Sequence, residues 1–311
     1  MNTTIKILEK FVFAKDSMIS ALSGVACVGE DVYFVGDNLP YLLKINRTQN
    51  MADATVFEKI PLFDPSEQIP LSALSKEQKP DFEALTSINW DGQSQLLVMG
   101  SGSTEKRKRA LLYNPANDQV KTFLEAVDYD FLQHQVELTG GADLNIEAIC
   151  SDHRYLYIFQ RGNINLHHGV LVFDLIKLQA GKSLANALIH SLKLSLAELD
   201  GSASGISDAC FLVDKNLIVA TATVEQTLNT YDDGAVLGSF ILVFSPDGKA
   251  LATHLIQDAK GQTLPIKVEG ITWFESRSDG EVFLLVTDSD GGDSEILKIL
   301  LSNAALGKSL S

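Results

Sequence analysis

A short phrase recurs five times along the chain and constrains the fold more than any other feature of the sequence. In its fullest form, at 268–271, it consists of Val-Glu-Gly-Ile: an acidic residue between apolar and small ones. The acidic position, or the residue that replaces it, falls at Ser23, Glu83, Glu147, Asp208 and Glu269. These markers are 60, 64, 61 and 61 residues apart, and a fixed period of this size is typical of repeat architectures. Five such units span nearly the whole chain.

Each unit carries the pattern of β-strands. After Ser23, short apolar runs at 25–28, 31–35 and 41–45 are separated by Gly, Asp and Asn. Runs of this kind, rich in Val, Ile, Tyr and Phe, are typical of strands joined by hairpins. Weaker fourth strands are expected at 56–60, 120–123, 188–192 and 252–256. Three clear strands and a weaker fourth predict the blade of a β-propeller.

The two ends of the chain complement each other. The last unit supplies only three strands before about residue 301, while the apolar run Ile5–Val12 precedes the first marker. Pairing this run with the last unit would close the ring and remove an exposed sheet edge. We therefore predict an all-β fold, one propeller domain over residues 1–311, with five blades of four strands and closure by the N-terminal strand. Six blades, with one unit hiding a degenerate pair, are the alternative. A short helix is expected near Ser195–Leu199.

The composition argues against several classes of partner. With 25 Lys and Arg against 40 Asp and Glu, the formal net charge is −15, whereas nucleic-acid binding needs a basic face. The same charge disfavours an anionic membrane surface. No apolar run approaches the about 18 residues of a membrane span, and the first residues lack the apolar core of a signal peptide. We expect a cytoplasmic protein, unless the chain is the trimmed form of a secreted one. The sequence does not indicate an oligomeric state.

Polar residues concentrate on one predicted face. In a propeller the first strand of each blade is the innermost, so the five markers should surround one mouth of the central channel. The loops between the second and third strands reach the same face, and polar loops gathered on one face are typical of a binding site. The loop residues expected to bind a small anionic ligand are Asp37, Arg109, Asn163, Glu225 and Asp288.

Four carboxylates directed at one axis repel one another unless something neutralises them. A hard divalent cation does so, and Ca²⁺ accepts oxygen donors of this kind. The expected metal ligands are Glu83, Glu147, Asp208 and Glu269. Two alternatives are protonation of one or two of the acids, with raised pKa values, and capping of backbone amides in the neighbouring blade by each acid. Arg161, which directly follows a strand, could pair with these carboxylates or anchor an anionic ligand.

At these repeats the chain resembles bacterial propellers of the esterase-like and phytase-like group and, more distantly, gluconolactonase-like and strictosidine-synthase-like propellers. The residues that carry the resemblance are the phrases around Glu83, Glu147 and Glu269, with the strand-then-polar-loop phrases that end in Asp37, Arg161 and Asp288. The resemblance implies an acidic channel that holds a divalent cation, commonly Ca²⁺. It also implies hydrolysis of phosphate esters or lactones. The group includes many uncharacterised propellers.

Two functional hypotheses follow. In the first, the chain is a metal-dependent hydrolase of a small anionic ester, phosphoester or lactone, with Glu147 and Glu269 as catalytic carboxylates and Arg161 orienting the substrate. In the second, it is a non-catalytic propeller that binds a small ligand or a protein on the same face. The sequence alone does not decide whether the chain is an enzyme.

Overall fold

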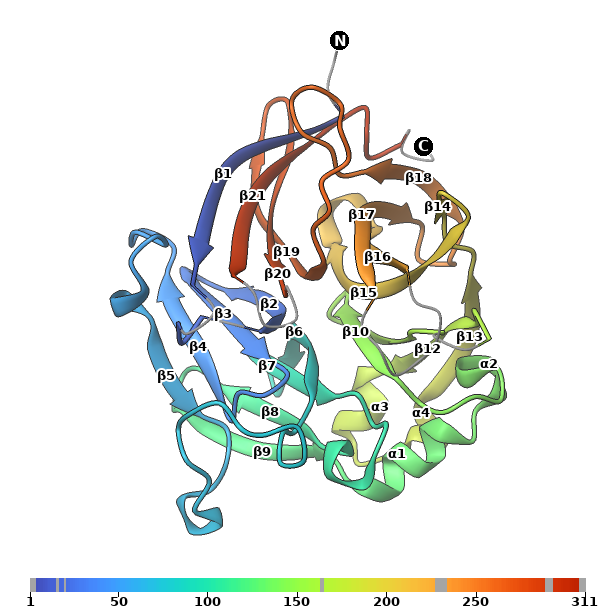
Figure 1. The fold of residues 1–311 in the computed structure, drawn as a ribbon. Helices are drawn as coiled ribbons and strands as arrows, with labels where there is room; N and C mark the ends of the chain where they lie inside the picture. Colours follow the sequence, from blue (N-terminus) through green and yellow to red (C-terminus); the bar gives the residue numbers. More distant parts are fainter. Residues whose placement is uncertain are drawn as a thin grey trace.

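The computed structural model describes residues 4–14, 17–19, 21–162, 165–226, 234–288 and 293–307. Five antiparallel sheets are arranged around a central axis as a five-bladed β-propeller (Figure 1). The prediction of five blades is therefore confirmed, and the alternative of six is wrong. The inner strands of the blades are β2, β6, β10, β15 and β19, which surround the central channel.

Within each blade, the strands follow one another outward from the channel. Blade 1 consists of β2 (Leu22–Val28), β3 (Asp31–Gly36), β4 (Tyr41–Asn46) and β5 (Glu58–Pro61). Blade 2 consists of β6 (Phe82–Trp90), β7 (Gln93–Gly100), β8 (Ala110–Asn114) and β9 (Gln119–Leu124). Blade 3 consists of β10 (Ile146–Ser151), β11 (Tyr155–Gln160), β12 (His168–Asp174) and β13 (Leu188–Leu194). Blade 4 consists of β15 (Ser202–Leu212), β16 (Leu217–Gln226), β17 (Ala235–Phe244) and β18 (Ala250–Leu255), with β14 (Glu198–Leu199) beside β15.

Blade 5 joins the two ends of the chain. It consists of β19 (Val268–Arg277), β20 (Gly280–Thr287), β21 (Ser294–Ser302) and β1 (Ile5–Phe13). Strand β1 pairs antiparallel with β21, from Ile5 opposite Leu301 to Phe13 opposite Ser294. This pairing covers the outer edge of β21 and closes the ring, as the sequence predicts.

Short helices occupy several connections between strands, both within and between blades. They are α1 (Ala126–Gln133), α2 (Val136–Thr139), α3 (Leu175–Gln179) and α4 (Leu184–Ala187), with 3₁₀ turns η1 (Ala54–Val56), η2 (Pro65–Glu67), η3 (Glu105–Arg107) and η4 (Val213–Lys215). In the described part of the chain, none of these helices is long and apolar enough to span a membrane.

The helix expected near Ser195–Leu199 is wrong. Strand β14 lies there and pairs with the start of β15, Glu198 opposite Ala203. The cause is the turn at Asp200 and Gly201, whose φ angles are 52° and 80°. Two successive positive φ angles are those of a type I′ turn, which produces a tight hairpin.

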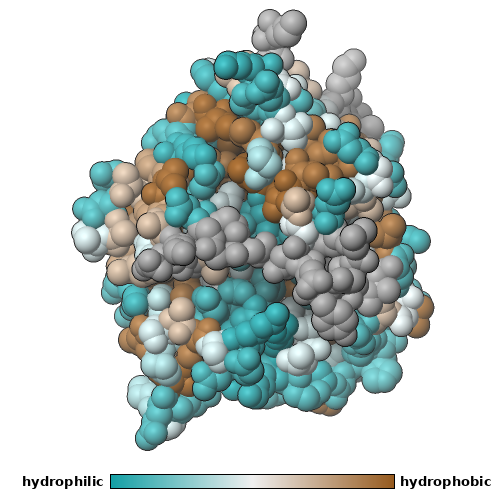
Figure 2. All heavy atoms as spheres, in the orientation of Figure 1, coloured by the Kyte–Doolittle hydropathy of each residue, from teal (hydrophilic) through white to brown (hydrophobic). Residues whose placement is uncertain are grey.

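The core lies between neighbouring blades because both faces of each sheet are apolar. One buried cluster, for example, packs Ile88 of blade 2 against Leu156 of blade 3. The outer surface is different: on the face seen in Figure 1, hydrophilic residues predominate over the lower half of the molecule (Figure 2). The rigid inner strands thus hold side chains at the two ends of the channel.

Candidate functional site

Every inner strand carries a β-bulge near its start. In each pairing of an inner strand with the second strand of its blade, one residue near the upper end of the inner strand has no partner of its own; β19 has a further bulge at Phe274. These bulge residues are Ser23, Glu83, Glu147, Ser207 and Glu269. A bulge redirects a side chain and is common beside active sites. All except Ser207 line a pocket of about 380 Å³ at one end of the channel, which we call the upper mouth.

The assignment of Asp208 to the repeated acidic position is wrong by one residue. The bulge residue of β15 is Ser207, so Asp208 takes the position that is Gly24 in β2 and Gly270 in β19. A small residue is expected there because neighbouring inner strands pack closely. A Cβ on Gly270 would lie 3.2 Å from Gly24 Cα and 2.5 Å from Val286 Cγ2.

Asp208 is directed at the neighbouring blade. Its side chain is fully buried, and Oδ2 accepts a hydrogen bond of 2.7 Å from the backbone N–H of Ile271. Burial raises the pKa of Asp208 well above its usual range, and the Ile271 amide opposes this rise. The geometry of Asp208 is that of amide capping between blades, while Glu83, Glu147 and Glu269 line the pocket.

Arg161 gathers three carboxylates at the upper mouth. Its Nη2 lies 3.1 Å from Glu225 Oε2, and its Nη1 lies 3.5 Å from Glu147 Oε2 and 3.9 Å from Glu269 Oε1. The guanidinium reaches this position across Gly205, where a Cβ would lie 2.7 Å from Arg161 Nε. Three predicted site residues, Glu147, Glu225 and Glu269, thus surround Arg161, which was also predicted. The pairing of Arg161 with the carboxylates, left open by the sequence, is the arrangement that the structure shows.

Lys267 provides the second cation of this cluster. Its Nζ lies 3.4 Å from Glu225 Oε1 and 3.7 Å from Glu269 Oε1. The side chains of Arg161 and Lys267 are only 11% and 13% exposed, so water screens these interactions weakly. The repulsion that suggested a metal at Glu147 and Glu269 is therefore offset by two cations of the chain itself.

Burial leaves Glu269 with an unusual proton affinity. Loss of solvation raises its pKa to about 8, with a further increase from Glu147 and Glu225 and an opposing effect of Lys267 and Arg161. Burial also raises the pKa of Glu147, against the lowering effects of Arg161, Lys267 and a hydrogen bond from Asn145. A carboxyl with a pKa near neutrality can give and take a proton under physiological conditions.

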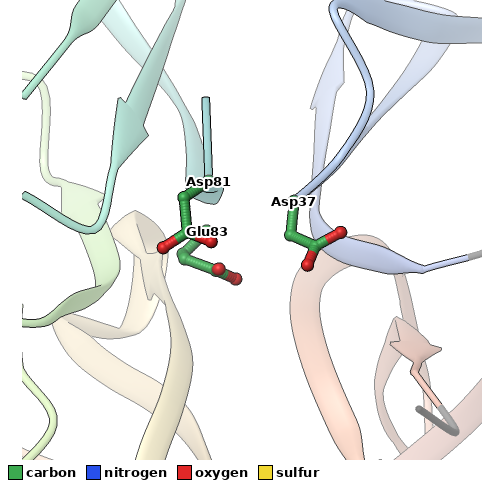
Figure 3. Close-up of side chains that lie close together, drawn as sticks. All are labelled: Asp37, Asp81 and Glu83. Carbon is green, nitrogen blue, oxygen red and sulfur yellow. The ribbon is translucent and has the colours of Figure 1, made fainter. Parts of the chain in front are cut away.

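A second group of acids lies across the pocket. One oxygen from each of Asp37, Asp81 and Glu83 falls within 4.8 Å of the others. Figure 3 shows the Glu83 carboxyl group directed across the gap toward Asp37, which lies in the loop after β3. Lys79 Nζ bridges the two aspartates, donating to Asp37 Oδ2 and lying 2.7 Å from Asp81 Oδ1. Arg107 Nη1 lies 2.9 Å from Asp81 Oδ2.

Glu83 differs from its two neighbours. None of the described residues forms a hydrogen bond or an ion pair with its carboxyl group. Burial raises the pKa of Glu83 well above the usual range, and Asp81, Glu147 and Asp37 raise it further. The upper mouth thus places a proton-retaining acid beside aspartates that are paired with Lys79.

The donor chemistry of this second group fits a hard cation. Ca²⁺ takes carboxylate and amide oxygens, and the group offers both because Asn38 lines the same pocket. Asp37 Oδ1 and Asn38 Oδ1 are buried, and neither has a hydrogen-bond partner among the residues described. Of the four metal ligands predicted from the sequence, Glu83 is the one that belongs to this group of acids. A cation here would compete with the ammonium group of Lys79.

The remaining predicted residues divide between the mouth and other places. Asp288 lines the pocket, while Asn163 lies outside the described residues. Arg109 lies away from it: its guanidinium stacks 4.8 Å from the Phe63 ring and pairs with Glu67. Of the basic run 106–109, Arg107 is the member that reaches the site.

The site residues predicted from the sequence did not include Lys79, Asp81 or Lys267. Asp81 and Lys267 lie two residues before Glu83 and Glu269, directly ahead of the inner strands. A polar residue two positions before the acid, present in three of the five repeats, was the signal that could have identified these two.

The fold and the charged upper mouth define a five-bladed propeller with a polar pocket in its channel. The chain belongs to DUF6929, a family of unknown function whose model matches residues 18–301. The β-propeller fold implied by the resemblance above is confirmed, whereas the family shown is DUF6929 and not the esterase-like and phytase-like group. No curated protein sequence matches the chain.

Solved structures share the fold at low sequence identity. A hypothetical protein from Leishmania major is 11% identical, with a TM-score of 0.51, over 98% of this chain and 94% of that one. An α-L-arabinofuranosidase from Podospora anserina, solved in complex with cellotriose, is 10% identical, with a TM-score of 0.51, over 93% of this chain and 95% of that one. Such identities indicate a common fold and nothing finer.

Proposed function

We propose that this protein is a hydrolase that acts on a small anionic ester, phosphoester or lactone in the upper mouth. The observation that carries the proposal is Glu269, a buried carboxyl with a pKa near 8, in a pocket of about 380 Å³. Pockets of a few hundred Å³ accommodate small molecules. Perturbed carboxyls in such pockets are frequent general acids and bases.

Residues of the chain itself serve as the acid, the base and the cations that bind the substrate. Glu269, protonated near pH 7, donates a proton to the leaving-group oxygen, and Arg161 with Lys267 stabilises the carboxylate that this leaves behind. Lys76 and Lys267 line the pocket and attract the substrate anion. Glu147, which lines the same pocket, accepts a proton from the attacking water.

The proposal includes a divalent cation, with Ca²⁺ as the best fit to an all-oxygen donor set. Asp37, Asn38 and Glu83 would hold it. When bound, such an ion polarises the scissile group and lowers the pKa of a coordinated water.

Turnover tests the hydrolase proposal directly. The wild-type chain is assayed with 4-nitrophenyl phosphate, 4-nitrophenyl acetate and an aliphatic lactone, with and without Ca²⁺. A 4-nitrophenyl arabinofuranoside is added because a structural neighbour is an arabinofuranosidase. We expect Glu269→Gln to lower kcat by about 10²- to 10⁴-fold, the usual contribution of a general acid. Glu275→Gln is the matched control, since Glu275 is exposed and pairs with Arg277 outside the pocket. Equal rates for Glu269→Gln and the control, or no turnover of any substrate, would contradict the proposal.

Calorimetric titration with Ca²⁺ tests the cation separately. Binding should disappear in the double variant Asp37→Asn/Glu83→Gln. It should become tighter in Lys79→Met, because the competing ammonium is gone. Heats of binding that are unchanged in both variants would exclude this site, whatever the turnover assay shows.

The alternative is a non-catalytic propeller that binds a ligand or a protein on the same face. The observation in its favour is that Arg161 already pairs with three carboxylates, as a purely structural network would. The double variant Glu147→Gln/Glu269→Gln separates the two functions: a binding scaffold keeps its ligand-induced rise in Tm, whereas the hydrolase loses turnover.

A further inference from the structure

The channel has a second opening at the opposite end of the inner strands, which we call the lower mouth. Its pocket measures about 780 Å³ and receives residues from all five inner strands. The fourth residue after each bulge lines it, namely Cys27, Ser87, Ser151, Phe211 and Trp273. Three of these are small and two, in adjacent blades, are aromatic. The lower mouth is therefore a cavity with an aromatic wall on one side and open space on the other.

The aromatic wall is rigid and accessible. Trp273 is 38% exposed, yet its indole Nε1–H donates a 2.8 Å hydrogen bond to Glu281 Oε2. Glu281 is itself held, because Ser276 donates to the same oxygen and Lys215 Nζ lies 3.0 Å from the other one. An indole fixed at its polar edge presents its face without loss of side-chain entropy on binding.

Phe211 extends this wall into blade 4. Its ring stacks on Tyr157, with centroids 5.7 Å apart and planes inclined by 30°. Both aromatic members of the lower mouth are thus fixed, Trp273 by Glu281 and Phe211 by Tyr157, which suits a flat, rigid ligand.

Arg47 supplies a cation at this mouth without a carboxylate beside it. Its guanidinium lies 4.7 Å from the Phe274 ring, and Nη1 donates to Phe274 O at 3.3 Å. Nε is buried and has no acceptor within the described part of the chain. The neighbouring thiol of Cys27 is neutral, since burial raises its pKa to about 11 in spite of Arg47.

The other cations that line this pocket are already paired. Lys215 interacts with Glu281, and Arg277 forms two hydrogen bonds to Glu275. Among the described residues Arg47 has no ion pair, although the chain carries a net charge of −15. A positive charge with a free donor beside an aromatic wall matches a ligand of complementary shape and charge.

We propose that the lower mouth is a second binding site, independent of the upper one, for a small molecule with a flat aromatic body and one anionic group. The ring stacks on Trp273 and Phe211, and the carboxylate, sulfonate or phosphate pairs with Arg47. This chemistry differs from that of the upper mouth, where acids predominate.

The test uses 2-naphthoate as the probe and its uncharged amide, 2-naphthamide, as the matched control. Calorimetry should give one site per chain for 2-naphthoate and weaker binding of the amide. Arg47→Gln should weaken 2-naphthoate by about 10- to 100-fold, the range for a hydrogen bond to a charged group, and remove the preference over the amide. Trp273→Leu should weaken both probes. Arg109→Gln should change neither by more than about twofold, because Arg109 pairs with Glu67 away from this pocket.

Fluorescence locates the site without altering Arg47. The chain has two tryptophans, and Trp90 packs against Phe123 in blade 2. In Trp90→Phe, emission therefore reports Trp273 alone, and saturable quenching by 2-naphthoate is expected. The proposal is overturned by a dissociation constant weaker than about 1 mM, by binding that leaves Trp273 emission unchanged, or by equal affinity of folded Arg47→Gln and wild type.

Discussion

Two carboxyl groups in adjacent blades, Glu269 of blade 5 and Asp208 of blade 4, both lose solvation through burial, but they have different partners. Glu269 faces the pocket, where Arg161 and Lys267 lie 3.9 Å and 3.7 Å from Oε1. Asp208 is withdrawn between the inner strands and accepts a 2.7 Å hydrogen bond from the Ile271 amide. Burial raises the pKa of both.

The difference separates a site for chemistry from a structural contact. Long contacts to two cations leave Glu269 free to gain or lose a proton without breaking a short hydrogen bond. The short bond of Asp208 ties β15 to β19 and lies where no substrate reaches, since the side chain is fully buried. A position one residue further along the same repeated phrase is enough to change the role of the acid.

The largest effect on stability is expected from removing Arg161, one of the two cations beside Glu269. Arg161→Met leaves Glu147, Glu225 and Glu269 buried with Lys267 as their remaining partner. Loss of one member of a buried ionic network typically costs about 3–5 kcal/mol. We expect a loss of that size in the free energy of unfolding, measured by urea denaturation at pH 7.5.

Arg109→Met provides the control for Arg161→Met. Arg109 forms a partly exposed pair with Glu67, and such pairs contribute about 0–1 kcal/mol. The double variant Arg161→Met/Glu225→Gln should regain part of the lost stability, because the carboxylate that lies closest to Arg161 is removed with it. A loss for Arg161→Met no greater than that of the control would show that the carboxylates do not depend on it.

The same two residues show how far the sequence predicts this molecule. The five-bladed ring, its strands and its closure by Ile5–Phe13 follow from periodicity, because alternation and turn residues determine strands locally. The repeat also brings Glu147 and Glu269 to one mouth. The interval of 61 residues, however, fits Asp208, and the one-residue shift to Ser207 depends on the bulge.

What the sequence could not supply is the direction and pairing of side chains. Lys79 and Asp81 come together with Asp37 through contacts between blades, and no local pattern encodes such contacts. Arg109 and Arg107 look equivalent in the run 106–109, yet Arg107, the last residue of η3, is the one that pairs with Asp81. The fold is local in origin, whereas the site is assembled from residues distant in the chain.

The next largest effect is a pH dependence of the free energy of unfolding, which a fully ionised Glu269 would not produce. Its pKa rises from an ordinary value near 4.5 to about 8 in the folded state. Between these values the folded chain holds a proton that the unfolded chain has released, so stability falls as pH rises. One such proton contributes a slope of up to about 1.4 kcal/mol per pH unit.

Glu269→Gln should make this part of the slope disappear. Urea denaturation of wild type and variant at pH 5, 6, 7 and 8 measures it, and the variant should gain relative to wild type with each step upward. Glu275→Gln, at an exposed position, should parallel wild type. Parallel curves for Glu269→Gln and wild type would mean that Glu269 is ionised throughout and unsuited to acid catalysis.

The smallest effect is expected at Asp208. If this side chain is neutral and serves only to accept the Ile271 amide, asparagine does the same through its own carbonyl oxygen, and Asp208→Asn should change stability at pH 6 by less than about 1 kcal/mol. Asp208→Ala restores the small residue of the other blades but leaves the buried Ile271 amide without its acceptor, which should cost about 1–3 kcal/mol. Thermal denaturation of the two variants at pH 6 measures the difference. A loss for Asp208→Asn as large as that for Asp208→Ala would mean that an acceptor for the Ile271 amide is not enough and that the negative charge itself is needed. Asp208 would then belong with the ionic network around Arg161.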